Sequence, residues 1–156
     1  MRNSHYLLNE VKRRTSQFMH NMDYVFIKSQ KKGYEEYGSL RARVNFEGKV
    51  YKMSAALEDG TVKAKMDWHD RSGNGDKTEF EADVSFMSKL QEIVSKYNLA
   101  QHNGYSHRVS GLPDMYGECI DIKYTSGESI HASDNQSGFL PFEAIKEIVQ
   151  LFHSYT

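Results

Sequence analysis

The strict alternation of apolar and polar side chains on both sides of Asp59 and Gly60 constrains this chain more than any other feature. An Asp-Gly pair fits a two-residue hairpin turn, because glycine accepts a positive φ without a steric clash. Counting outward from this turn places every apolar residue opposite another apolar residue, and a slip of one position would destroy that agreement. The predicted pairs are Leu57 with Val62, Ala55 with Ala64, Met53 with Met66, and Tyr51 with Trp68.

A second reversal, at Glu47 and Gly48, predicts another strand before this hairpin. Residues 39–46 alternate in the same way, so that Val44 falls opposite Tyr51 and Ala42 opposite Met53. The three strands then form a meander with one apolar and one polar face. The polar face is basic, and an open basic sheet is a candidate surface for single-stranded nucleic acid. Its predicted binding residues are Arg41, Arg43, Lys52, Lys63 and Lys65.

The second half of the chain repeats this pattern. Residues 145–152 (IKEIVQLF) match residues 90–97 (LQEIVSKY), and both lie in amphipathic segments that predict helices at 83–98 and 141–154. A second hairpin is predicted around a three-residue loop, 126–128, with Tyr124 opposite Ile130 and Lys123 opposite His131. Between the hairpin glycine and the matching helix, the first half has twelve more residues than the second. Those extra residues contain 70–81.

These patterns predict one α+β domain spanning residues 1–156. We expect an antiparallel sheet of about six to seven strands, with helices packed on one face. The repeat further predicts a duplicated βββα unit, 38–98 and 104–154, behind an N-terminal helix at 6–22.

Residues 104–152 also resemble small uncharacterised bacterial proteins that contain a domain of unknown function. The likeness is carried by a strand, an (S/D)G turn, a second strand and an Asn- and Phe/Pro-containing loop that leads into an amphipathic helix, here from GYSHRV through YTSGESIHASDNQSGFLPF to IKEIVQLF. The resemblance implies a bacterial origin and a strand-turn-strand-helix order. It implies no activity and no catalytic residues.

Composition restricts the environment in which the chain works. The formal net charge is −1, so no global field recruits nucleic acid or an anionic membrane. A single cysteine, Cys119, excludes an internal disulfide framework and fits a reducing compartment. No stretch is apolar enough for a signal peptide or a membrane span, so we expect a soluble, cytoplasmic protein.

The segment DRSGNGDKTEFE, residues 70–81, has the ligand spacing of a calcium loop. Two features oppose calcium: the segment follows a strand where a calcium loop needs a helix, and Lys77 stands where such loops carry an apolar side chain. The same residues also fit a solvated turn that continues into a strand. The metal ligands that the calcium hypothesis predicts are Asp70, Ser72, Asn74, Asp76 and Glu81.

Other polar residues give weaker indications. The segment 131–142 joins a strand to a helix start, where amides can hold an anion or a peptide carboxylate, and its candidate binding residues are His131, Asp134 and Asn135. Cys119 is a candidate nucleophile, although no hydrolase motif surrounds it. The seven histidines lack the helical i, i+4 spacing of a zinc site.

Polar loops on a stiff sheet, without a convincing catalytic constellation, favour a non-enzymatic binding module whose partner is another protein. Two alternatives stay open: a metal-dependent protein or enzyme that uses residues 70–81, Cys119 or the histidines, and a weak nucleic-acid binder that uses the basic sheet face. The sequence leaves the oligomeric state open.

Overall fold

The computed structural model describes residues 22–30, 49–112 and 117–156. The predicted helix at 6–22, the predicted strand at 39–46, and the candidate binding residues Arg41 and Arg43 therefore lie outside the described residues, apart from Met22.

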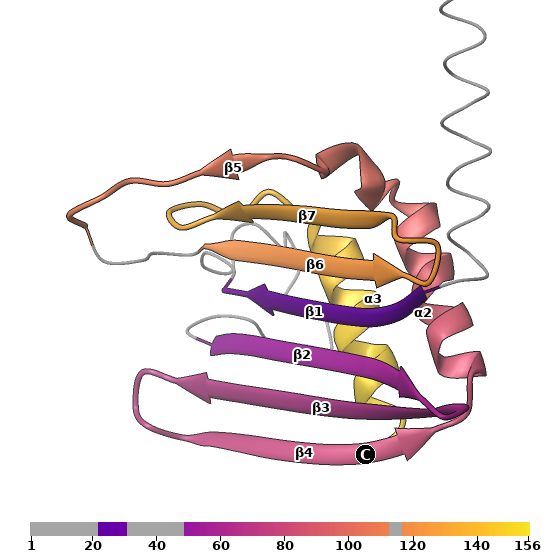
Figure 1. Ribbon diagram of the computed structural model, residues 1–156. Coiled ribbons are helices and arrows are strands. Elements are labelled where there is room, and N and C mark those ends of the chain that lie inside the picture. The colour runs from indigo at the N-terminus through magenta and orange to yellow at the C-terminus, as the bar shows by residue number, and fades with distance from the viewer. Residues whose placement is uncertain (1–21, 31–48, 113–116) are drawn as a thin grey trace, which may run out of the picture.

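Within the described residues, seven strands form a single sheet, and Figure 1 shows α2 (Ser85–Lys96) and α3 (Phe142–His153) together behind it. The strand order is β4-β3-β2-β1-β6-β7-β5, so β1, the first of the described strands, is the central one. We call the side of the sheet opposite the helices the open face. The strands are β1 (Met22–Ser29), β2 (Lys49–Glu58), β3 (Thr61–Asp70), β4 (Gly75–Ala82), β5 (Ser106–His107), β6 (Glu118–Tyr124) and β7 (Ser129–Asp134).

The hairpin predicted around Asp59 and Gly60 is confirmed as β2 and β3. Both turn residues have positive φ, 52° for Asp59 and 81° for Gly60, as the two-residue turn requires. The four predicted apolar pairs all occur in the observed register. Tyr51 is buried and Trp68 is partly buried against the same core, so alternation assigned the faces of these strands correctly.

The other side of β2 is occupied by β1. Ser29 lies opposite Tyr51 and Ile27 opposite Met53. The predicted pairing of Val44 with Tyr51 and Ala42 with Met53 was therefore wrong, because a strand has only two edges and β3 takes the other.

The predicted duplication is not confirmed. The twelve extra residues of the first half supply the turn and the strand β4, which has no counterpart in the second half. In the second half, β5 instead pairs with β7 in parallel, so the sheet is mixed and the purely antiparallel prediction was wrong.

The second hairpin was predicted with the correct faces and an incorrect register. Tyr124 and Ile130 are both buried, but Ile130 lies opposite Ile122. His131 accordingly faces Asp121, and the predicted pairing of His131 with Lys123 was wrong.

In the part of the chain that the structure describes, two helices cover one face of the sheet: α2 (Ser85–Lys96), followed by the 3₁₀ turn η2 (Leu99–His102), and α3 (Phe142–His153). Asp83 caps α2, because its carboxylate accepts the backbone N–H of Ser85 at 2.9 Å. Positions that match in sequence are buried alike in the two helices, as Leu90 and Ile145 show. Among the described residues, no helix combines the length and apolar character needed to cross a bilayer.

Candidate functional site

The open face carries two aromatic side chains at its centre, Tyr24 and Phe26. Both belong to β1, whose residues alternate between the core and the open face, and Val25 and Ile27 are completely buried on the core side. Tyr24 and Phe26 are each only half-buried. Among the described residues, no helix covers this side of β1, and the aromatic pair lies outside the hydrophobic core that these residues form.

Next to these rings the sheet surface is hollow, because β2 presents small side chains there. Ala56 lies opposite Tyr24, and Ser54 lies opposite Phe26. Beyond them, β3 presents lysines and β4 presents glutamates, which form the far wall of a groove of about 600 Å³. We call this the open-face groove. Its two cross-strand rows are Tyr24, Ala56, Lys63, Glu81 and Phe26, Ser54, Lys65, Glu79.

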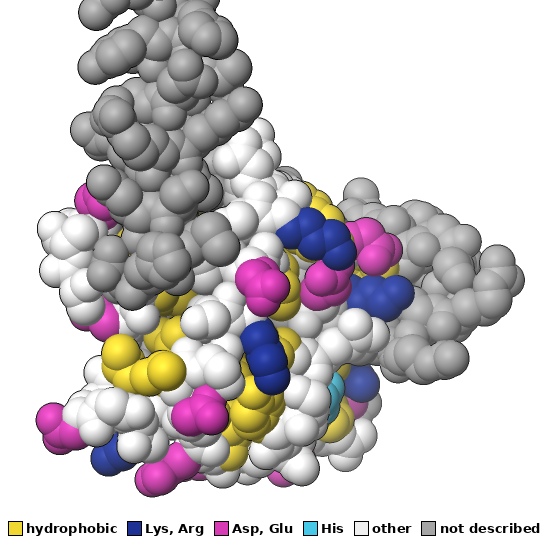
Figure 2. All heavy atoms as spheres, turned by 90° about the vertical axis from the view of Figure 1, so that its right-hand side faces the viewer, with side chains coloured by type: hydrophobic (Ala, Val, Ile, Leu, Met, Phe, Trp, Pro, Cys, Tyr) yellow, Lys and Arg dark blue, Asp and Glu magenta, His cyan; other side chains and the backbone are white. Residues whose placement is uncertain are grey.

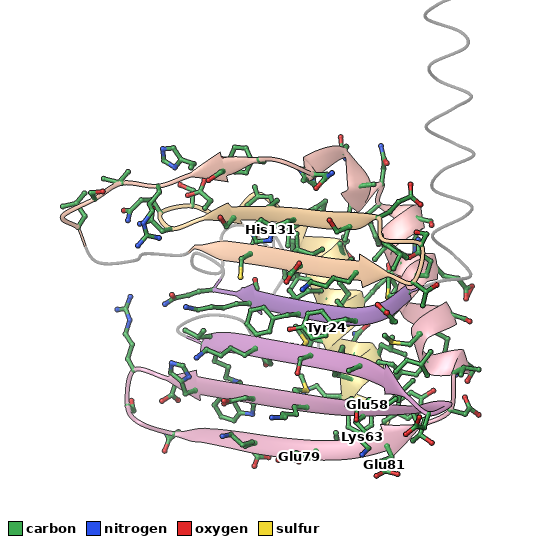
Figure 3. All side chains as sticks on the ribbon, viewed as in Figure 1. Tyr24, Glu58, Lys63, Glu79, Glu81 and His131 are labelled. Atoms are coloured by element: carbon green, nitrogen blue, oxygen red, sulfur yellow. The ribbon has the colours of Figure 1, made fainter. Side chains whose placement is uncertain are left out.

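Charges of both signs surround the groove. Lys63 lies 3.8 Å from Glu58, and the ammonium group of Lys123 lies 5.7 Å from the centre of the Tyr24 ring. Burial, together with the nearby Asp121 carboxylate and Cys119, raises the pKa of Tyr24, so its hydroxyl remains a neutral hydrogen-bond donor. Figure 3 shows Tyr24 on β1, Lys63 on β3, and Glu79 and Glu81 on β4, with His131 on the other side of β1.

The basic face predicted from the sequence is electrostatically mixed. Lys52, Lys63 and Lys65 are exposed on the open face, as alternation predicted. Each of them has an acidic residue in register on an adjacent strand: Asp67, Glu81 and Glu79, respectively. The side of the molecule drawn in Figure 2, at right angles to the open face, also carries acidic and basic side chains close together. A single-sign field therefore does not develop across the lysines.

The five calcium ligands predicted within residues 70–81 do not converge. Asp70 closes a turn, where its Oδ1 accepts the backbone N–H groups of Ser72 at 2.9 Å and Asn74 at 3.0 Å. Asp76 and Glu81 lie on β4, five residues apart, which is about 16 Å of extended chain. In the described ranges, no group of three or more His, Cys, Asp or Glu side chains converges on a metal position. The alternative from the sequence, a turn continuing into a strand, is what forms.

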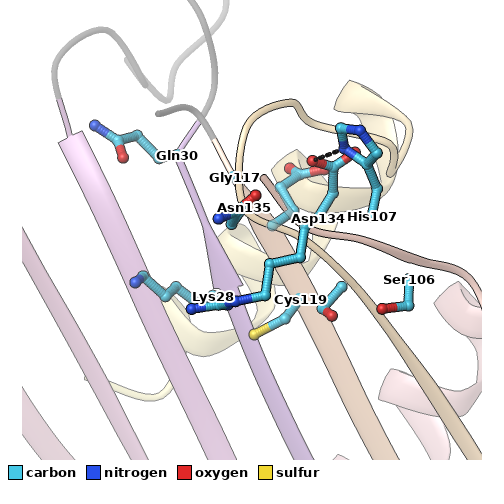
Figure 4. Close-up of a pocket in the computed structure, with 11 residues that line it drawn as sticks. Lys28, Gln30, Ser106, His107, Gly117, Cys119, Asp134 and Asn135 are labelled. Atoms are coloured by element: carbon cyan, nitrogen blue, oxygen red, sulfur yellow. Dashed lines mark hydrogen bonds and ion pairs between the residues drawn. The ribbon is translucent and has the colours of Figure 1, made fainter. Parts of the chain in front are cut away.

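A second hollow, the end pocket, lies where β1, β6 and β7 meet β5 and the residue that follows it, and has a volume of about 230 Å³ (Figure 4). Asp134 lies in its wall and is 5 % exposed. Its carboxylate accepts hydrogen bonds from Tyr105 Oη at 2.7 Å, the backbone N–H of Gln136 at 2.8 Å and that of Ser137 at 3.0 Å, and lies 3.1 Å from His107 Nδ1.

These bonds determine the ionisation of Asp134. Burial by itself raises the pKa of this carboxyl, but the hydrogen bonds from Gln136, Tyr105, His107 and Ser137 together outweigh burial and hold the pKa well below its ordinary range. Asp134 is therefore ionised near neutral pH and fully occupied by the chain's own donors. Asn135 is also occupied, because its side-chain amide exchanges two 3.0 Å hydrogen bonds with the backbone of Val109.

Glu118, opposite Asp134 on β6, has a similar position and was not identified from the sequence. It is 2 % exposed, and its Oε1 accepts the backbone N–H groups of Phe139 and Leu140, both at 2.8 Å. Its Oε2 accepts the Ser29 hydroxyl at 2.6 Å. Glu118 and Asp134 thus hold segments of the fold together, and the oxygens of both carboxylates are bonded to donors of the chain itself.

The structure also places two further candidates from the sequence, Cys119 and His131. Burial is the main cause that raises the pKa of the Cys119 thiol, so near neutral pH it is protonated and weakly nucleophilic. His131 is exposed on the open face, and its Nδ1 lies 3.7 Å from Asp121.

Sequence reasoning missed Tyr24 and Phe26, although the alternation in DYVFIK contained the signal that both share a face.

No protein-family model and no curated protein sequence matches this chain, so the interpretation of its surfaces depends on their geometry.

Proposed function

We propose that this chain is a non-enzymatic binding module that holds an extended segment of another protein in the open-face groove. The observation that carries the proposal is the cross-section of the groove. An aromatic ring, Tyr24, forms one side, Ala56 and Ser54 form a low floor, and a wall of Lys63 and Glu81 forms the other side. Such a cross-section offers an apolar side chain a ring to pack against, and offers its polar neighbours charges of both signs.

Charge favours a protein segment over nucleic acid. A phosphate backbone gains affinity from lysines but is repelled by carboxylates. The groove is lined by three glutamates, Glu58, Glu79 and Glu81, against two lysines, Lys63 and Lys65. A polypeptide can supply both signs along one extended segment, so the partner we propose has an apolar or aromatic residue flanked by basic and acidic side chains.

Three observations support the non-enzymatic role and the cytoplasmic location that we propose. The buried carboxylates Glu118 and Asp134 accept hydrogen bonds from the fold itself, and the Cys119 thiol is held in its protonated form. A lone free thiol is compatible with a reducing compartment.

A selection from a displayed library of linear peptides tests the proposal. Peptides selected on the wild-type protein should lose at least about tenfold in affinity for Ala56→Arg, because the new side chain fills the floor of the groove. Ser129→Arg is the matched control, since Ser129 is exposed on β7, three strands away from β2. Equal binding to both variants, measured by titration calorimetry, would contradict the proposal.

One observation favours nucleic acid as a second candidate. Tyr24 and Phe26 supply the outward aromatic rings on which unpaired bases stack, which the sequence analysis did not find. Fluorescence anisotropy with a labelled oligonucleotide separates the candidates. Binding that weakens steeply with salt and is lost in Tyr24→Ala would favour nucleic acid, whereas no binding at low salt would remove it.

A further inference from the structure

The free edge of β4 presents a regular set of backbone hydrogen-bonding groups. In the part of the chain that the structure describes, β4 is the last strand on its side of the sheet. The N–H of Asp70 donates to the carbonyl of Asn74 at 2.8 Å, which makes these two residues a hydrogen-bonded pair. Because such pairs alternate along an antiparallel ladder, the even-numbered residues of β4 bond to β3. The groups directed outward belong to Gly75, Lys77, Glu79 and Glu81. Among them, the N–H of Lys77 donates to the Oδ1 of Asp76 at 2.9 Å, an exposed contact that a pairing strand displaces.

This edge is held firmly in place. The register between β3 and β4 continues from Gly75 to Ala82 without a shift. On the core side, the Phe80 ring contacts Phe86 at 5.6 Å and Phe152 at 6.0 Å between centroids, and it stacks on Tyr155 at 5.5 Å. An anchored edge with a continuous register needs little reorganisation beyond release of the Lys77 N–H from Asp76, so pairing costs little conformational entropy.

We propose that the strand which pairs with this edge is β4 of a second copy of the chain, antiparallel and centred on Thr78. In that register Lys77 lies opposite Glu79 of the second copy, and Glu79 opposite its Lys77. Both are hydrogen-bonded pairs formed by the outward groups, and so is Gly75 with Glu81. The twofold axis therefore repeats each ion pair, and Thr78 meets its own copy on the helix-covered side of the sheet.

Charge and face parity select this register over its neighbours. In a register that pairs odd-numbered with even-numbered residues, Lys77 or Glu79 of one copy would lie on the helix-covered side of the other copy's sheet. Centring on Glu79 would place that carboxylate against its own copy. Centring on Phe80 would place Glu79 against Glu81, another like-charge contact.

The charges also continue correctly across the new interface. Within one chain Lys65 lies opposite Glu79, and Lys77 lies opposite Asp67. The proposed register adds the Lys77 of the second copy beyond Glu79, so the signs alternate through four strands. The dimer is independent of the proposed peptide binding, although it places a lysine of the second copy beside the groove wall.

Sedimentation velocity over a concentration series tests the dimer. We expect association of the wild-type chain, weakened by at least about tenfold in Lys77→Glu and in Glu79→Lys, since each places like charges together twice. The double variant Lys77→Glu/Glu79→Lys should recover most of the affinity. Glu81→Lys is the matched control: it makes the same charge change on the same strand and face, but opposite Gly75, and should change association little.

Three outcomes would overturn the proposal: a monomer at every concentration, single variants that associate as the wild type does, or a double variant without recovery. The double variant retains both unfavourable contacts with β3, so its recovery reports the contact between copies and not the stability of the fold. Circular dichroism verifies that each variant is folded. If a charge reversal prevents folding, Lys77→Gln and Glu79→Gln replace the reversals, with the same expected direction.

Discussion

The two halves of the sheet, on either side of β1, use carboxylates in opposite ways. In the β6–β7 half, Glu118 and Asp134 are buried and saturated by backbone and side-chain donors. In the β2–β4 half, Glu79 and Glu81 are exposed and face lysines across the strands. The difference teaches that the same functional group stabilises the fold where the chain's own donors reach it, and remains available for recognition where they do not.

The largest effect that tests this comparison should come from Glu118→Ala. Removal of the carboxylate leaves the buried N–H of Leu140, the partly buried N–H of Phe139 and the Ser29 hydroxyl without their acceptor. We expect a loss of about 3–5 kcal/mol in the free energy of unfolding, measured with urea. Glu118→Gln, which keeps one acceptor oxygen, should cost clearly less. A loss below about 1 kcal/mol for the alanine variant would show that the hydrogen bonds accepted by Glu118 do not stabilise the fold.

An intermediate, pH-dependent effect is expected from Asp134→Asn. The pKa of Asp134 is lower in the folded protein than its ordinary value of 3.8, so ionisation stabilises the fold above that pH. This contribution is lost progressively as the pH falls below the ordinary value. We expect the wild type to exceed the variant by about 1–3 kcal/mol near neutral pH, with the gap narrowing in acid. A gap that stays constant from pH 7 to pH 3 would contradict this explanation.

The smallest effect should come from Glu81→Gln on the exposed half. Glu81 on β4 lies opposite Lys63 on the adjacent strand β3, and both side chains are exposed to solvent. Exposed pairs of opposite charge contribute little to stability. The free energy of unfolding should change by no more than about 0.5 kcal/mol. A cost comparable to that of the Asp134 variant would abolish the distinction between the two halves.

Alternation predicted the β2–β3 hairpin residue for residue, because its turn fixes the register locally. It also placed the buried faces of β6, β7 and both helices, since burial of an apolar stripe is encoded in spacing. Residues 23–29 form a β-prone run in the sequence, but such a run can pair with many other strands, and only the assembled sheet shows that β1 joins β2 to β6. β4 was ambiguous because its polar residues suit a loop as well as an edge strand.

The site was harder to predict for the same reason. The outward direction of Lys52, Lys63 and Lys65 followed from the hairpin, whereas the acidic neighbours of Lys63 and Lys65 come from β4. The open-face groove depends on Tyr24 standing beside Ala56, a contact between strands separated by a long connection. Asp134 and Asn135 were recognised as polar residues before a helix, but their internal partners, Tyr105 and Val109, are distant in sequence.

The hydrogen bonds that Glu118 accepts from Ser29, Phe139 and Leu140 have a consequence for the motions of the chain. Phe139 and Leu140 precede α3 in a segment without regular secondary structure, where amide hydrogens ordinarily exchange with solvent quickly. Because both amides bond to a carboxylate on β6 that also holds the last residue of β1, they can open only when the centre of the sheet separates from the start of α3. Their deuterium uptake should therefore be as slow as that of the central strands, so that two loop amides report the opening of the whole core.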